Sequence, residues 1–257
     1  MIGIFDSGVG GLSIASSIRA LLPNEHILYI ADSAHAPYGD KPVEFIEERA
    51  SAIIAFLMER NVKAVVVACN TATVSAIHKL RANYAIPMIG VEPGIKPAIL
   101  KSRSGVVGVL ATTQTLKSAS FSELSQRFST HVTVEVQPCP GLVEQVEALN
   151  LDSEETEALI KRYVFPLLEK GADHIVLGCT HYAYLTPAIQ KVIGPNITII
   201  NTATAVATEL ARRLELECLL STRREPGRDE FWSSGLQHIA TEQLSKLWGK
   251  PVDVLQL

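Results

Sequence analysis

The chain has 257 residues, of which 47% are hydrophobic and 19% are charged, and its formal net charge is −4. This composition excludes the disordered and fibrous classes and is typical of a globular chain with one large or two small domains. Lysine and arginine form no dense stripe apart from Arg223, Arg224 and Arg228, so we expect no nucleic-acid partner.

The sequence also argues against membrane and metal-binding classes. No apolar run approaches the roughly 18 residues of a membrane-spanning helix, and the opening MIGIFDSG has none of the regions of a signal peptide. We therefore expect a cytoplasmic protein that does not bind membranes. Cys69, Cys139, Cys179 and Cys218 form no C-x-x-C pair, so we expect reduced thiols and no zinc site or thioredoxin motif.

The chain opens with a strand, a glycine-rich turn and a helix. Ile2 to Phe5 is apolar, Asp6 to Gly11 reads DSGVGG, and a helical period follows from Leu12 to Leu22. A dinucleotide fingerprint needs a third glycine where Ser13 stands, so we expect no phosphate cofactor. The glycines allow a ligand close to the backbone. Asp6 is either a helix N-cap or a functional carboxylate.

The next segments repeat the strand and helix pattern. Ile27 to Ala31 is a strand, and the turn-rich loop Asp32 to Lys41 follows it. We expect Tyr38, within this loop, to be exposed to a cleft. The segment from about Pro42 to Arg60 has the apolar period of an amphipathic helix, and its charged face needs no functional explanation.

Two apolar strands end in a cysteine followed by small polar residues. Val65 to Ala76 reads VVVACNTATVSA and Ile175 to Tyr182 reads IVLGCTHY, and each opens a helix-like segment. In open α/β sheets, ligands bind at the carboxyl ends of strands, where helix N-termini carry partial positive charge. That field stabilises a thiolate, so we expect lowered pKa values and acid/base or nucleophilic roles for Cys69 and Cys179. The alternative is a small apolar side chain at each position.

The pattern restarts after Glu92-Pro93-Gly94. We expect strands at Val106–Leu110, Val132–Val136, Ile197–Ile200 and, at an edge, Val252–Leu255, and helices at Ser153–Lys170 and near Leu236–Leu247. The repeated units predict an α/β fold with two similar domains, each a mostly parallel sheet flanked by helices, which face each other across a cleft. We expect residues 1–94 with 206–257 in the first domain, which carries Cys69, and residues 95–205 in the second, which carries Cys179.

Two thiols on opposite walls of one cleft suit a stereoinversion, in which a proton leaves one face of a carbon and another arrives at the opposite face. Asp6 and His181 are candidate positioning partners of Cys69 and Cys179, although His181 alone is equally suited to capping or packing. Donors for substrate carboxylates are expected from Ser7, Asn70, Thr71, Thr180 and the Tyr38-Gly39 loop.

The sequence contains, in this order up to about residue 210, FDSGVGG, PYG, ACNTA, GVEPG, ATTQT, CPGLVEQVE and LGCTHY. This ordered set resembles the glutamate racemases of the aspartate/glutamate racemase superfamily. The resemblance implies an isomerase that interconverts L- and D-glutamate with two thiols, without a cofactor or metal, and supplies D-glutamate for peptidoglycan and cell wall biogenesis. The implied partner is the glutamate substrate, and a homodimer is an open expectation.

The resemblance also implies the site residues. Its catalytic set is Cys69, Cys179, Asp6, His181 and Glu147. Its substrate-binding set is Asp6, Ser7, Tyr38, Gly39, Asn70, Thr71, Thr180 and His181, with Thr115 as a further substrate hydroxyl. Two positions depart from the family pattern, because Asn201 replaces a usual acidic residue and Ala183 a common proline.

Three alternatives stay open at this point. An aspartate racemase of the same superfamily also keeps two cysteines and differs in substrate length. A cysteine hydrolase would use Cys179 and His181 as nucleophile and base, but a separation of two residues is poor geometry for such a pair and leaves Cys69 unused. A binding protein with this fold would hold an amino acid without turnover.

Overall fold

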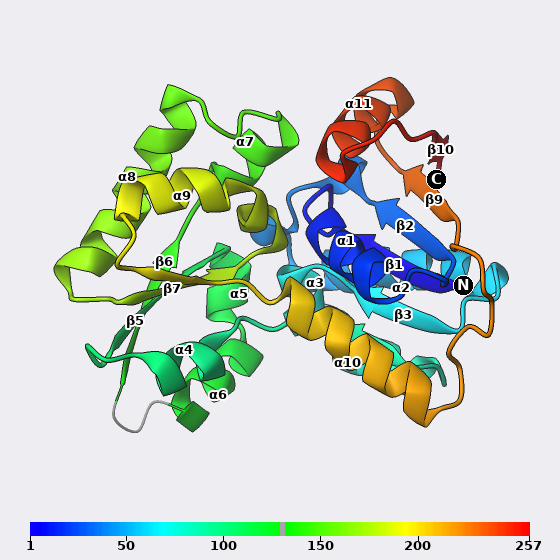
Figure 1. Ribbon diagram of the computed structural model, residues 1–257, viewed down its shortest axis with the longest axis horizontal. Coiled ribbons are helices and arrows are strands. Elements are labelled where there is room, and N and C mark those ends of the chain that lie inside the picture. The colour runs from blue at the N-terminus through cyan, green and yellow to red at the C-terminus, as the bar shows by residue number, and fades with distance from the viewer. Residues whose placement is uncertain (129–131) are drawn as a thin grey trace.

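The computed structural model describes residues 1–128 and 132–257 and contains two sheets side by side, each covered by helices (Figure 1). The strand order is β10-β9-β2-β1-β3-β4 in the six-stranded sheet and β6-β5-β7-β8 in the four-stranded sheet. Every strand pairing within the described residues is parallel. Parallel sheets need cover on both faces, which explains the nearly continuous apolar runs of their central strands.

The six-stranded sheet is built from both ends of the chain. Its strands are β1 (Ile2–Asp6), β2 (Ile27–Ala31), β3 (Ala64–Val67), β4 (Met88–Gly90), β9 (Asp229–Ser233) and β10 (Val254–Gln256). Side chains alternate between the two faces, so Ile4 and Phe5 belong to different core clusters. One face packs against α1 (Leu12–Leu21), α10 (Ala203–Leu216) and α11 (Gln237–Trp248), and the other against α2 (Val43–Glu59) and α3 (Asn70–Asn83).

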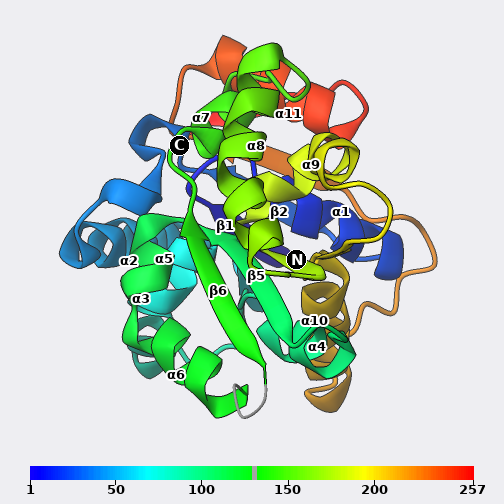
Figure 2. The same cartoon turned by 90° about the vertical axis from the view of Figure 1, so that its left-hand side faces the viewer.

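The four-stranded sheet comprises β5 (Val106–Ala111), β6 (Thr133–Pro138), β7 (His174–Gly178) and β8 (Thr198–Ile200). The helices α4 (Ile95–Lys101), α5 (Thr113–Lys117) and α6 (Ala119–Phe128) lie on one face. On the other face lie α7 (Leu142–Glu147), α8 (Glu154–Glu169) and α9 (Thr186–Ile193). Figure 2 looks onto the edge strand β6, with α7 and α8 on one side and α4 and α6 on the other.

Three short 3₁₀ helices lie in loops, η1 (Ser33–His35), η2 (Tyr38–Asp40) and η3 (Thr180–Leu185). The loop with η2 contacts α5, and η3 contacts both α7 and α1, so these segments join the two sheets. Val9, from the turn after β1, packs in the core cluster of the four-stranded sheet. Among the helices of the described residues, none is long and apolar enough to cross a membrane.

The predicted α/β fold with two parallel sheets flanked by helices is confirmed. Two details of the prediction are wrong. The strand β9 was not expected, and the edge strand begins at Val254 rather than Val252. The division into residues 1–94 with 206–257 and residues 95–205 stays a prediction, and its second boundary falls in the first turn of α10.

Candidate active site

Cys69 and Cys179 reach the space between the sheets from different strands. Cys69 follows β3 and caps α3, where its Sγ accepts a hydrogen bond from the amide of Ala72 at 3.4 Å. Cys179 follows β7 and precedes η3. Both thiols are buried, with exposed fractions of 5% and 8%. The charge of Cys179 acts on Cys69, so the two thiols share one electrostatic environment.

The predicted lowering of the pKa of Cys69 is wrong. Burial raises this pKa well above the ordinary value of a thiol, and the charge of Asp6 raises it further. The hydrogen bond from Ala72 acts in the opposite direction but is the weaker effect. The reason is that an enclosed thiolate loses its hydration, which the N-terminus of one helix does not replace. Cys69 is therefore a neutral thiol at neutral pH.

Asp6, at the end of β1, forms hydrogen bonds with residues that lie beside both cysteines. Its Oδ1 accepts hydrogen bonds from the amide and hydroxyl of Ser7, at 2.6 and 3.2 Å, and its Oδ2 accepts one from Thr180 Oγ1 at 2.9 Å. The thiol of Cys69 lies 3.7 Å from Ser7 Oγ. Asp6 thus reaches Cys69 through the Ser7 hydroxyl. Burial raises the pKa of Asp6, although the charge of His181 partly offsets this effect.

His181 joins Cys179 to Glu147. Its Nδ1 lies 3.8 Å from Cys179 Sγ, and its Nε2 lies 2.6 Å from Glu147 Oε1, which also accepts the amide of Val9 at 2.9 Å. Burial lowers the pKa of His181, but its contacts with Cys179 and Glu147 and the charge of Asp6 outweigh burial and raise it well above the ordinary value. A cationic imidazole in this position can stabilise negative charge that develops on the sulfur of Cys179.

The glycine-rich turn after β1 can lie close to Glu147 and His181 of the facing sheet because it lacks side chains at two positions. A Cβ atom at Gly8 would collide with the Glu147 carboxylate, and one at Gly10 would collide with the imidazole and amide of His181. From the sequence, these glycines were expected to allow a ligand close to the backbone. In the structure they instead leave room for two candidate catalytic side chains of the facing sheet.

The predicted exposure of Tyr38 to a cleft is wrong. Its ring is 1% exposed, and its hydroxyl donates to Asp32 Oδ2 at 2.5 Å. Arg49 pairs with the same carboxylate at 2.8 Å, which ties the loop to α2. Beside Tyr38, a Cβ atom on Gly39 would lie 3.0 Å from Thr112 Cβ, so the loop backbone packs closely on the start of α5. The hydroxyl of Tyr38 is therefore used within the fold, in the link between this loop and α2.

Three threonine hydroxyls form a cluster between the sheets. Thr71 Oγ1 lies 2.9 Å from Thr112 Oγ1 and 3.4 Å from Thr115 Oγ1. Asn70, next to Thr71, donates through its amide to the carbonyl of Val91 at 3.3 Å, so one of its two amide hydrogens already has a partner within the fold. The hydroxyls lie at the carboxyl ends of β3 and β5, where ligands of α/β sheets bind.

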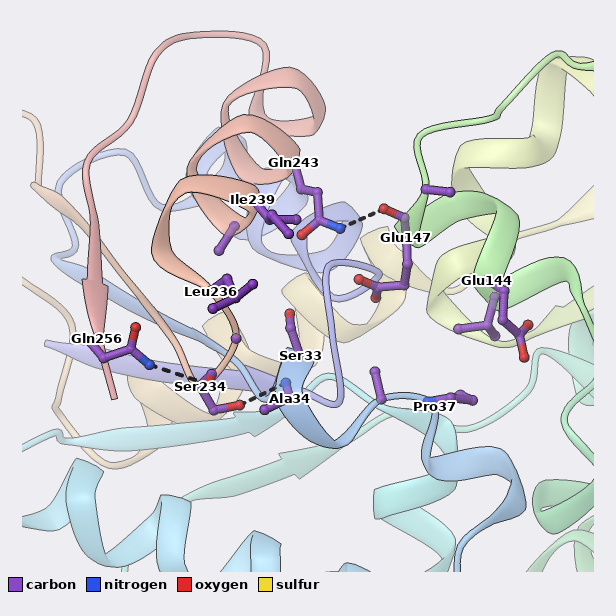
Figure 3. A pocket seen from close by; sticks show the side chains of 15 residues that line it. Ser33, Ala34, Pro37, Glu144, Glu147, Ser234, Leu236, Ile239, Gln243 and Gln256 are labelled. Carbon is purple, nitrogen blue, oxygen red and sulfur yellow. Dashed lines mark hydrogen bonds between the residues drawn. The ribbon is translucent and has the colours of Figure 1, made fainter.

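The candidate site is closed. Ten residues predicted for the site have an exposed fraction of 8% or less: Asp6, Ser7, Tyr38, Cys69, Asn70, Thr71, Thr115, Cys179, Thr180 and His181. A cavity of about 10 Å³ adjoins Cys179, whereas a cavity of about 830 Å³ lies beyond Glu147, between α7, α11 and the loop around η1 (Figure 3). The thiols are therefore shielded from solvent in this structure. Among the described residues, no three His, Cys, Asp or Glu side chains are grouped to hold a metal ion.

Comparison with known proteins identifies the family of this chain. Residues 12–210 match the profile of the Asp/Glu/hydantoin racemases. A glutamate racemase of Methylococcus capsulatus is 55% identical over 96% of this chain and 91% of its own length. The chain belongs to the Asp/Glu/hydantoin racemase family.

Solved structures of racemases share the fold. Glutamate racemase isoform RacE1 from Bacillus anthracis has a TM-score of 0.91 and 33% identity, with coverage of 100% of this chain and 97% of its own. Escherichia coli glutamate racemase, in complex with L-glutamate and the activator UDP-MurNAc-Ala, has a TM-score of 0.88 and 34% identity, with coverage of 99% and 96%.

In this racemase-family chain, the structure brings together most of the residues predicted for the site. Asp6, Ser7 and Thr180 belong to the hydrogen-bond network of Cys69, and His181 and Glu147 to that of Cys179. Thr71 and Thr115 belong to the separate threonine cluster, and Asn70 bonds to Val91. Tyr38 and Gly39 lie on the loop against α5. Thr112 and Asp32 were not among the residues predicted from the sequence. Thr112 follows β5 directly, so its position at a strand end was a usable signal. Asn201 departs from the family pattern but has a structural role, because its Oδ1 accepts the amide of Ala203 at 2.8 Å at the start of α10.

Proposed function

We propose that this protein interconverts L- and D-glutamate without a cofactor, with Cys69 and Cys179 as acid/bases on opposite faces of the substrate's α-carbon. The observation that carries the proposal is the pairing of two buried thiols from different sheets, each with its own polar partners. Cys69 has the Ser7 hydroxyl and, through it, Asp6. Cys179 has His181, which Glu147 holds from the other side.

The two thiols need opposite protonation states at the start of a turnover. Cys69, whose pKa is raised by burial, is the protonated partner. Cys179 is the base, because the cationic His181 beside it stabilises its negative charge. One sulfur removes the α-proton, and the other delivers a proton to the opposite face, after which the two protonation states are exchanged. The reverse reaction starts from that exchanged state.

The substrate's charges have partners in the same region. The N-terminus of α3, at Asn70 and Thr71, offers backbone N–H groups and partial positive charge for a carboxylate. The second amide hydrogen of Asn70 and the backbone of the Tyr38-Gly39 loop supply further donors. The hydroxyls of Ser7 and Thr180 donate to Asp6, so they serve a substrate carboxylate only after they turn away from Asp6. Both the α-carboxylate and the side-chain carboxylate of glutamate can thus be held while the α-carbon lies between the sulfurs.

Our proposals on product use, location and assembly rest on the family likeness alone. We propose that the D-glutamate serves peptidoglycan synthesis and that the protein acts in the cytoplasm. A homodimer stays a proposal, which light scattering of the purified protein tests directly.

A coupled assay for D-glutamate formed from L-glutamate tests the proposed function. The dialysed protein is assayed with chelator present and pyridoxal phosphate absent, with L-aspartate as the competing substrate. We expect turnover of glutamate and little turnover of aspartate. Preference for aspartate would move the protein to the aspartate racemases, and glutamate binding without turnover would favour a binding protein.

A further inference from the structure

The C-terminal helix contacts the candidate active site at one point. Gln243, on α11, donates from Nε2 to the backbone carbonyl of Glu147 at 2.6 Å (Figure 3). The helix α11 packs on the six-stranded sheet, whereas α7, which ends at Glu147, packs on the four-stranded sheet. This hydrogen bond therefore joins the two halves of the molecule beside the site.

Glu147 is the last residue of a short helix, where its backbone carbonyl has no partner within the helix. The helix spans only Leu142–Glu147, starts after Gly141 in a left-handed conformation, and is followed by Leu149 with a positive φ of 60°. The last carbonyls of a helix have no partner within it, and Gln243 supplies one for Glu147. The carboxylate of the same residue holds His181 Nε2 at 2.6 Å. Backbone and side chain of Glu147 thus connect α11 to the imidazole.

We propose that Gln243 is a positioning residue for the Cys179 side of the reaction, acting through Glu147 and His181. The inference rests on the proposed racemase function. Loss of the bond lets the end of α7 move, so the Glu147 carboxylate holds the imidazole less firmly. The proton transfer at Cys179 then slows, whereas the Cys69 side keeps its partners, Ser7 and Asp6.

The helix α11 offers a matched control. Gln237 lies on the same helix and also donates from Nε2 to a backbone carbonyl at 2.6 Å, but its acceptor is Val254 of β10, within its own sheet. Gln243→Met and Gln237→Met each remove one such donor from α11 and keep a side chain of similar length. Gln243→Lys keeps a donor at the critical position.

The first measurement is steady-state racemisation in both directions, with protiated and α-deuterated glutamate. For Gln243→Met we expect kcat to fall about three- to tenfold, as for the loss of one hydrogen bond, with little change in KM. The isotope effect should rise for the enantiomer that loses its proton to Cys179 and fall for the other. We expect wild-type values for Gln237→Met and a smaller loss for Gln243→Lys. A merely structural defect lowers the active fraction and leaves both isotope effects unchanged.

The second measurement is an NMR titration of ¹⁵N-labelled histidine, which needs no turnover. The groups acting on His181 are Glu147, Cys179 and Asp6, and in Gln243→Met we expect the pKa of His181 to fall toward its ordinary value. Unchanged kinetics and titration in Gln243→Met, or equal effects in Gln237→Met, would overturn the inference. An inactive wild type would contradict the proposed function alone, since the titration still tests the coupling from Gln243 to His181.

Discussion

Replacing Glu147 by glutamine tests whether Glu147 holds His181 in a charged state beside Cys179. Glu147 Oε1 lies 2.6 Å from His181 Nε2, and the carboxylate side chain is 18% exposed. Glu147→Gln keeps the shape and an oxygen for the amide of Val9 but removes the negative charge. A hydrogen bond to a charged group contributes about 1.5–3 kcal/mol. If the transition state needs a cationic His181, losing this hydrogen-bond energy corresponds to about a ten- to hundredfold fall in kcat.

The same substitution should change the pH dependence. Burial lowers the pKa of His181, but contacts that include the hydrogen bond to Glu147 raise it well above the ordinary value, so the wild-type imidazole stays protonated as the pH rises. The resulting stabilisation of the fold is complete below the unfolded pKa and is lost as the pH rises through the raised folded pKa. In Glu147→Gln both this loss and the alkaline fall of kcat should move to lower pH.

The assay is kcat against pH for both enantiomers, together with urea unfolding at the same pH values. Glu144→Gln is the matched control, because Glu144 lies on α7 and lines the 830 Å³ cavity with Glu147. We expect wild-type behaviour from this control. A Glu147→Gln protein with wild-type kcat and an unmoved alkaline limb would refute the role of Glu147 in holding a cationic His181.

Three further predictions follow from the geometry. Cys69→Ser and Cys179→Ser should each nearly abolish racemisation, whereas Cys139→Ser should keep it. If Cys139→Ser were as inactive as the other two variants in the coupled assay, the site assigned here would be wrong. Asp32→Asn should lower the free energy of unfolding by about 1.5–3 kcal/mol in urea, because it removes the charge of a buried carboxylate that accepts hydrogen bonds from Arg49 and Tyr38. Burial raises the pKa of Asp32, but its hydrogen bonds outweigh burial and lower the pKa. The difference in unfolding free energy between wild type and Asp32→Asn should therefore shrink as the pH falls through the pKa of Asp32 in the folded protein. A difference that does not depend on pH would contradict an origin in the charge of Asp32. Gly10→Ala should lower the free energy of unfolding by about 1–3 kcal/mol, because its methyl group would collide with His181, and it should also reduce kcat. Wild-type stability and wild-type kcat in this variant would contradict the close contact between the two sheets.

Local sequence patterns were sufficient for the central elements of the fold. The strand Ile27–Ala31 has the predicted bounds, and the helix expected from Pro42 to Arg60 runs from Val43 to Glu59. Both have strong apolar periods that tertiary contacts reinforce. The strand β9 was not predictable in this way, because DEFWS begins with two charged residues and becomes a strand through its pairing with β2 and β10.

The candidate site shows where such reasoning ends. The positions of Cys69 and Cys179 at strand ends were readable from the sequence, since each follows an apolar run. The raised pKa of Cys69 was not, because burial in the folded chain outweighs the effect of the local helix N-terminus. Glu147 became a candidate only through the family resemblance, as its contacts with Val9 and His181 join residues far apart in the chain.

The most direct test of two opposed thiols follows hydrogen isotopes during racemisation in heavy water. At low conversion of L-glutamate, one sulfur keeps the proton it removes while the other delivers a solvent-derived deuteron. The account predicts D-glutamate that carries deuterium and recovered L-glutamate that stays largely unlabelled. Appreciable transfer of the original proton into the product, or early deuterium in the recovered substrate, would contradict the opposed action of Cys69 and Cys179 even if both were essential.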